Sequence, residues 1–161
     1  MRYVSAGAST FVSGRPYSWT LAGDGRFFGA MLTSAGLADI KTYADGIGPW
    51  KPQLMAWTIA ARNGNGDGNG DGSGDGAGDG ALADVTTATP TGLVAAAHRA
   101  GLFVHSFTFR NERTYLAGMY HGDPQAELRD FFNAGIDGVF SDFTPTVVRA
   151  RGQYTRRPAA Q

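Results

Sequence analysis

AAAHRAGLFVHSFTFRNE, residues 95–112, is the segment that decides the fold class of this chain of 161 residues. It starts as the end of an alanine-rich helix and reaches Gly101, a residue type that ends helices readily because glycine adopts positive φ without strain. Residues 102–109 follow as an almost continuous apolar run. Such a run is typical of a strand covered on both faces in a parallel sheet. The segment therefore predicts one helix-to-strand unit of an α/β fold.

The same order of helix, glycine and strand occurs twice more, once on each side of this segment. The predicted elements are helices over residues 34–44 and 124–134 and strands over residues 46–49 and 138–143. A strand near residues 2–6 and a helix over residues 145–151 extend the pattern. Alternating helices and strands predict a parallel sheet with right-handed crossovers. Three to four β/α units make only part of a closed eight-stranded barrel, which takes about 250 residues.

Two helix starts carry a capping signal. Thr89 precedes Pro90, and Asp123 precedes Pro124. A short polar side chain at the N-cap accepts a hydrogen bond from the first turn, and proline fits the first helical position. The sequence therefore predicts helices that begin at Pro90 and Pro124.

Composition excludes several classes of protein. The 14 basic side chains balance 14 acidic ones, which argues against nucleic acid or an anionic membrane as a partner. The absence of cysteine excludes disulfides and cysteine-ligated metals. No apolar run reaches the roughly 20 residues of a membrane span, and the first residues lack the apolar core of a secretory signal. As written, the chain is expected in the cytoplasm, or outside it if an earlier N-terminus carries a signal peptide.

A glycine-rich tract occupies residues 63–80, with glycine at every even position. Its lack of large apolar groups predicts a flexible surface insert. Residues 67–72, DGNGDG, fit the opening of a calcium loop, but Gly78 stands where such a loop needs a bidentate glutamate. Weak Ca²⁺ binding and a purely solvated linker both stay open. Residues 152–161 are predicted to be a disordered tail, which leaves residues 1–151 as the domain.

Three segments resemble the glycerophosphodiester phosphodiesterase family: residues 36–51 (GLADIKTYADGIGPWK), residues 95–112, and residues 131–151 (FFNAGIDGVFSDFTPTVVRAR). They are similar, in order and spacing, to the sixth, seventh and eighth strands of the family's (β/α)₈ TIM barrel. Residues 15–24 resemble the loop after its fifth strand. The resemblance implies the C-terminal half of a barrel of phosphodiesterase type. It also implies metal-assisted hydrolysis of glycerophosphodiesters to glycerol 3-phosphate and an alcohol, in lipid and glycerol metabolism.

The chain departs from the family in the catalytic half of the barrel. It has no His-Arg-Gly and no Glu-x-Asp motif, and its only glutamates, Glu112 and Glu127, belong to the C-terminal half. The divalent cation (Ca²⁺ or Mg²⁺) of the complete family enzyme therefore has no ligands here, and no catalytic or metal-binding residue is assigned. The chain alone is expected to be inactive. The alternative is a non-catalytic fragment or an interaction module, whose open sheet edges pair with an N-terminal half or with another copy.

Five residues at predicted strand ends are candidates for the substrate-binding wall: Lys51, Phe107, Arg110, Glu112 and Asp142. The arginine could clamp a phosphate through its bidentate fork, or form a salt bridge with either acid. The phenylalanine aligns with an aromatic that faces the glycerol in the family. Alternatively, it is a core residue that shares its strand face with Phe103, His105 and Phe109.

Two of the remaining candidates have alternative roles that do not involve the substrate. Lys51 adds a positive charge beside the GIGP turn or is a solvated surface residue, and Asp142 contacts the substrate or orders a loop backbone. Three histidines, His98, His105 and His121, lack metal-ligand spacing and are assigned no catalytic role.

Overall fold

The computed structural model describes residues 3–4, 14–59 and 82–155 of the chain. The glycine-rich insert, with its candidate calcium segment, lies outside these ranges, as do the last six residues of the predicted tail. None of the helices in the described ranges is long and apolar enough to cross a membrane.

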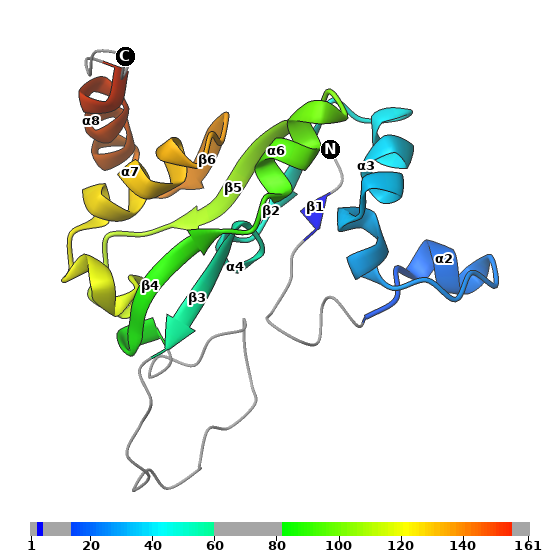
Figure 1. Cartoon of the computed structure of the whole chain (residues 1–161), viewed down its shortest axis with the longest axis horizontal. Helices are drawn as coiled ribbons and strands as arrows, with labels where there is room; N and C mark the ends of the chain where they lie inside the picture. The colour runs from blue at the N-terminus through cyan, green and yellow to red at the C-terminus, as the bar shows by residue number, and fades with distance from the viewer. Residues whose placement is uncertain (1–2, 5–13, 60–81, 156–161) are drawn as a thin grey trace, which may run out of the picture.

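The described part is an α/β structure with two sheets (Figure 1). Its strands are β1 (Tyr3–Val4), β2 (Gly46–Pro49), β3 (Met55–Ile59), β4 (Val85–Pro90), β5 (Phe103–Phe109) and β6 (Gly138–Ser141). Its α-helices are α2 (Tyr17–Leu21), α3 (Ser34–Lys41), α4 (Lys51–Leu54), α6 (Leu93–Arg99), α7 (Pro124–Asn133) and α8 (Thr144–Thr155). Short 3₁₀ turns are η1 (Phe28–Leu32), η2 (Arg113–Tyr115) and η3 (Gly118–Tyr120).

The four-stranded sheet has the order β1-β2-β5-β6, and every pairing in it is parallel. The three predicted strands and the fourth near the start of the chain are confirmed. A parallel sheet with helices between its strands is consistent with part of an α/β barrel.

The hydrophobic core lies between this sheet and the helices that cover one of its faces. Ile47 of β2 and Val104 of β5 pack with Leu37 of α3, Ala97 of α6 and Phe131 of α7, and each is at most 1% exposed. Burial of each large apolar side chain contributes about 1.5–3 kcal/mol. The apolar stripes predicted for the helices face this core, but the expectation that β5 is covered on both faces is wrong, since Phe103 is 57% exposed.

The hairpin of β3 and β4 is the element that the sequence analysis did not predict. Its strands are antiparallel, and Met55 pairs with Pro90 at one end. β4 contacts η3. Just before β4, the carbonyl group of Ala83 lies so close to η3 that a Cβ on Gly118 would collide with it. The hairpin therefore lies against the segment that follows β5, beyond the C-terminal end of that strand.

The predicted start of the second helix is wrong. Thr89 and Pro90 belong to β4, and α6 begins at Leu93 after Gly92, whose φ is +85°. The β-branched run of β4 pairs with β3, and proline is tolerated at the end of such an edge strand. In contrast, the predicted N-cap Asp123 is confirmed, because its carboxylate accepts a hydrogen bond from the N–H of Gln125 at 2.9 Å.

The last helix is longer than predicted. α8 extends to Thr155, so residues 152–155, expected in the disordered tail, are helical. Gly152 lies within the helix and does not end it, because a single glycine costs only about 1 kcal/mol relative to alanine. Tyr154 of this added turn lies against Phe132 of α7, with ring centroids 5.6 Å apart.

Asp137 joins three elements on the helix-covered side of the sheet. Its carboxylate oxygen Oδ2 accepts a hydrogen bond from the N–H of Val104 at 2.8 Å and lies 2.8 Å from His98 Nε2 of α6. Partial burial by itself raises the pKa of this carboxyl, but the hydrogen bonds from Val104 and His98 outweigh it and leave the pKa below the ordinary value of 3.8. The ionised form is therefore the one that stabilises the fold.

We expect Asp137→Ala to lower the free energy of unfolding by about 1–2 kcal/mol at pH 6, since it leaves the Val104 N–H without its acceptor. The depressed pKa makes this contribution complete above pH 3.8 and lost as the pH falls through the lower, folded-state value. Urea titrations of both proteins between pH 6 and pH 2.5 measure the difference. Asp45→Ala is the matched control, because Asp45 also precedes a strand glycine but its side chain is 91% exposed. A difference that does not shrink as the pH falls from 6 to 2.5 would contradict the ionic origin.

Candidate functional site

The candidate residues gather where the parallel strands end. Lys51 follows β2, residues 110–112 follow β5, and Asp142 follows β6. Because these strands are parallel, their C-terminal ends lie at the same edge of the sheet, where α/β proteins bind ligands. The structure brings Arg110, Glu112 and Asp142 together there, and it places the other two candidates differently.

Arg110 is the centre of this cluster. Its guanidinium contacts the Glu112 carboxylate through two nitrogens, with Nη2–Oε1 at 2.6 Å and Nε–Oε2 at 3.2 Å. Asp142 Oδ2 lies farther away, 4.0 Å from Nη1. The hydrogen bond lowers the pKa of Glu112 and raises that of Arg110, so both groups stay charged. The salt bridge considered as an alternative role for Arg110 is thus present, yet the arginine side chain is still 34% exposed.

Tyr115 completes the cluster and was missed by the sequence analysis. The Arg110 guanidinium carbon lies 4.5 Å from the centroid of its ring, in a cation–π arrangement. The sequence feature that could have identified it is an aromatic residue five positions after Arg110, in the same loop.

Ser141, and not Asp142, makes the side-chain hydrogen bonds that order the loop backbone after β6. Its hydroxyl donates to the carbonyl oxygen of Phe109 at 2.6 Å and accepts from the N–H of Phe143 at 3.0 Å. The Asp142 side chain is 75% exposed. Asn111 adds a second tie, since its amide nitrogen donates to the Thr146 hydroxyl at 3.0 Å. The Ser141 bonds hold the ends of β5 and β6 together, and the Asn111 bond ties the loop after β5 to α8.

Lys51 is not a solvated surface residue, contrary to one of its two predicted roles. It is 5% exposed, and its ammonium lies 2.7 Å from Oε1 of Glu127, which is also buried. The chain turns directly from β2 into α4, which places Lys51 beneath the segment that follows β5, 3.4 Å from the carbonyl oxygen of Tyr115. Burial raises the pKa of Glu127, and the lysine ammonium opposes that shift. The Lys51 ammonium therefore interacts with Glu127 and with the Tyr115 carbonyl inside the protein, and not with solvent.

Phe107 is half-buried, and the alternation of burial along β5 groups it with the less buried positions of the strand, unlike Phe109. Burial alternates along β5, with Phe103 57% exposed, Val104 buried and Phe107 half-buried. The register shifts between Ser106 and Phe109, so Phe109 turns to the helix side and is 2% exposed. Its ring meets that of Phe131 edge-on, with centroids 5.0 Å apart.

Histidines and acids are the candidate ligands for a divalent cation among the residues that the structure describes. In these ranges no group of three or more His, Cys, Asp or Glu side chains is arranged to hold a metal ion. Of the two acids near the sheet edge, Glu112 is paired with Arg110 at 2.6 Å, and Asp142 lies 4.0 Å from the same guanidinium. His98 pairs with Asp137, and His105 packs edge-on against Phe140 with centroids 6.2 Å apart.

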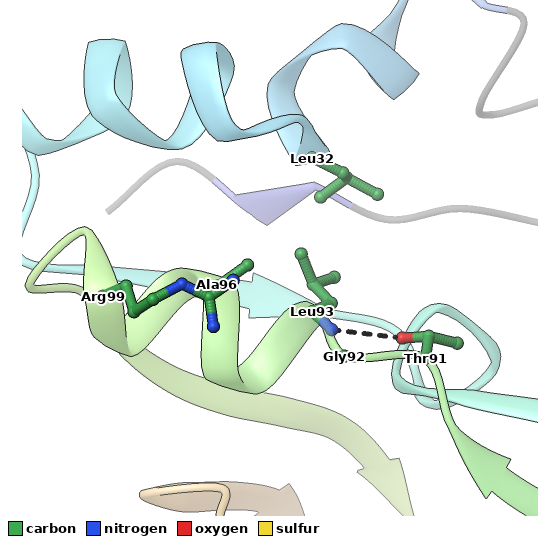
Figure 2. Close-up of a pocket in the computed structure, with 6 residues that line it drawn as sticks. All are labelled: Leu32, Thr91, Gly92, Leu93, Ala96 and Arg99. Carbon is green, nitrogen blue, oxygen red and sulfur yellow. Dashed lines mark hydrogen bonds between the residues drawn. The ribbon is translucent and has the colours of Figure 1, made fainter.

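A cavity of about 460 Å³ lies elsewhere, between η1 and the start of α6 (Figure 2). It is lined by Leu32, Thr91, Gly92, Leu93, Ala96 and Arg99. None of the five candidate residues lines it. The strand-end cluster around Arg110 and this cavity are therefore separate features of the structure.

A parallel α/β sheet places the C-terminal ends of its strands at one edge, where proteins of this fold class bind ligands. The fold by itself does not give the function, whereas similarity to known proteins identifies the family. No protein-family model matches the chain. The chain is 38% identical over 117 residues to glycerophosphodiester phosphodiesterase GDPD6 of Arabidopsis thaliana, which covers 71% of this chain and 25% of that protein. It is 26% identical over 153 residues to glycerophosphodiester phosphodiesterase GDPDL6 of the same plant, which covers 94% of this chain and 16% of that protein.

The chain belongs to the glycerophosphodiester phosphodiesterase family. It spans a quarter or less of the length of these two curated relatives. The family resemblance carried by the strand ends is thereby confirmed.

Proposed function

We propose that this chain forms the substrate-holding wall of a glycerophosphodiester phosphodiesterase. In the reaction, water adds to the phosphorus atom and the P–O bond to the alcohol breaks, which leaves glycerol 3-phosphate and the free alcohol. The observation that carries the proposal is the Arg110 guanidinium, which is held at the end of β5 and partly open to solvent. A planar fork of N–H donors is suited to the oxygens of a phosphodiester.

Arg110 would bind two non-bridging phosphate oxygens by exchanging its Glu112 contact for the substrate. Glu112 is 41% exposed, and partly exposed ion pairs contribute little net stability. The exchange therefore costs little, while Tyr115 keeps the guanidinium in place. Before the substrate arrives, Arg110, Glu112 and Asp142 together carry a formal charge of −1, so release of Glu112 from the guanidinium is the step that makes room for the phosphate.

Phe107 would supply the apolar surface for the glycerol carbons, because it is half-buried on the open face of β5. No three potential ligands for the cation that the family resemblance implies come together in the described residues, and the sequence has no His-Arg-Gly or Glu-x-Asp motif. We therefore assign this chain binding and orientation of the substrate, and no chemical step.

Arg110→Gln is expected to weaken the binding of sn-glycerol 3-phosphate by about tenfold or more, because it removes a charged, bidentate donor. A titration followed by ¹⁵N–¹H spectra of the backbone amides measures the affinity and locates the site. Arg129→Gln is the control, since it also removes an arginine with an acidic partner, Asp123 at 3.4 Å, but on α7. Equal affinities in all three proteins, or shifts confined to regions away from residues 107–115, would contradict the proposal.

A second candidate is a partner-dependent module without chemistry of its own. The observation in its favour is the open face of the sheet, where Phe103 is 57% and Phe140 38% exposed. Exposed aromatic groups on a sheet face favour association. Sedimentation at micromolar concentration separates the cases, because a single monomeric species would count against this candidate.

A further inference from the structure

Two contacts connect the buried interior of the protein to Arg110. The Lys51 ammonium lies 2.7 Å from Glu127 Oε1 and 3.4 Å from the carbonyl oxygen of Tyr115. The ring of Tyr115 in turn lies under the Arg110 guanidinium, at 4.5 Å. Tyr115 therefore makes both contacts: its backbone carbonyl accepts from the buried Lys51 ammonium, and its ring contacts the Arg110 guanidinium.

The exposed part of this cluster has little that could fix it by itself. Tyr115 is 41% exposed, and the Arg110–Glu112 pair is about one-third exposed or more on both sides. Such pairs exchange with water and contribute little. The buried anchors of the loop are Leu116 and Ala117, which come after the tyrosine. At Tyr115 itself the N–H donates to the Glu112 carbonyl oxygen at 3.0 Å within η2, and the carbonyl oxygen accepts from the buried Lys51 at 3.4 Å. The Lys51 bond is the one that ties this turn to the interior.

The chemistry of the buried pair suits this role. A lysine ammonium has three N–H donors, so it can serve the Glu127 carboxylate and a backbone carbonyl at once. The side chains of Lys51 and Glu127 are 6% and 1% exposed, and burial of this kind keeps both of them in one geometry. The ammonium also lies 5.3 Å from the centroid of the Phe109 ring, the last residue of β5. The pair thus lies beneath both the end of the strand and the loop that follows it.

We propose that Lys51 is a positioning residue, which with Glu127 fixes the Tyr115 peptide and thereby holds the Arg110 guanidinium in its orientation at the end of β5. The functional meaning of this role rests on the proposed function, in which Arg110 binds phosphate. The positioning itself is a property of the chain without ligand, so it is testable separately.

The test uses the double variant Lys51→Met/Glu127→Met. It removes both charges together, so neither is left buried without a partner, and such replacements by apolar residues are often neutral for stability. The readout is the Arg110 Nε–H resonance, assigned by its disappearance in Arg110→Gln. In the parent protein we expect the Tyr115 ring, 4.5 Å from the guanidinium carbon, to shift this resonance upfield. In the double variant we expect it to move most of the way to the value of free arginine, while the melting curve stays cooperative.

Two further variants separate positioning from a general loss of structure. Tyr115→Leu removes the ring but keeps the carbonyl, so adding it to the double variant should move the resonance no further, as expected for two changes that act through one group. Asp137→Ala destabilises another part of the fold and should leave the resonance unchanged. If the double variant does not fold, Lys51→Met/Glu127→Gln replaces it with the same expected shift.

An unmoved Arg110 resonance in a folded double variant would overturn the inference, as would an equal shift in Asp137→Ala. Titration with sn-glycerol 3-phosphate then tests the functional link, with an expected loss of affinity of about tenfold in the double variant. If the parent chain binds none of this ligand while the resonance moves as expected, the proposed function fails and the positioning role stands.

Discussion

Substituting Lys51 alone by methionine is expected to lower the free energy of unfolding by about 3–5 kcal/mol, because the single change leaves a buried carboxylate without its partner. Glu127 is 1% exposed, and its second oxygen, Oε2, has no hydrogen-bond partner in the described part of the chain. The lysine is therefore its main compensation. Urea unfolding followed by tryptophan fluorescence measures the loss.

Lys41→Met is the matched control for this experiment. Lys41 also faces an acid, Asp45 at 3.4 Å, but their side chains are 43% and 91% exposed. Its substitution should change stability by about 0.5 kcal/mol or less. A Lys51→Met protein as stable as this control would show that Glu127 is neutral in the fold and that the pair has no role in stability.

The local part of the fold could be predicted from the sequence because its signals act over a few residues. Gly101 and Gly135 both end helices at positive φ, +76° and +92°, a conformation that side chains with a Cβ disfavour. The apolar runs after these glycines form β5 and β6, as predicted. The stripes of α3 and α7 face the core for the same reason, since helical spacing fixes which side chains share a face.

The missed elements depend on contacts between distant residues. β3 and β4 pair across a separation of more than 20 residues that includes the glycine-rich tract. No turn signal joins them directly, and the capping pattern at Thr89 and Pro90 gave a competing local prediction. Strand pairing prevailed, because backbone hydrogen bonds in a hairpin outnumber the single bond that a cap provides.

In the candidate site, too, contacts between residues close in sequence could be predicted, and contacts between distant residues could not. Arg110 and Glu112 are two positions apart, so their pairing could be anticipated from spacing alone. Lys51 and Glu127 are 76 positions apart, and no local pattern shows that a lysine after a strand will be covered by a later loop and helix. The turn of Phe109 to the helix side depends on an irregular register between β5 and β6, which alternation along one strand does not reveal.

Catalysis by the family's reaction needs groups that the described residues do not combine. The sequence has no His-Arg-Gly or Glu-x-Asp motif, and in the described ranges no three potential ligands converge. A bound cation supplies several kcal/mol of stabilisation to the charge that develops on a transferred phosphoryl group. Each 1.4 kcal/mol corresponds to about tenfold in rate, so its loss reduces turnover by orders of magnitude even where Arg110 binds the phosphate.

We therefore expect the purified 161-residue chain to release no measurable glycerol 3-phosphate from glycerophosphocholine with either Ca²⁺ or Mg²⁺ present. An enzyme-coupled assay for glycerol 3-phosphate follows the reaction. Co-expression with the N-terminal half of a related enzyme is the complementary arm, in which activity should return and should fall with Arg110→Gln but not with Arg129→Gln. Turnover of about 1 s⁻¹ or more by the chain alone, a rate typical of an intact enzyme, would contradict the assignment of substrate binding without chemistry.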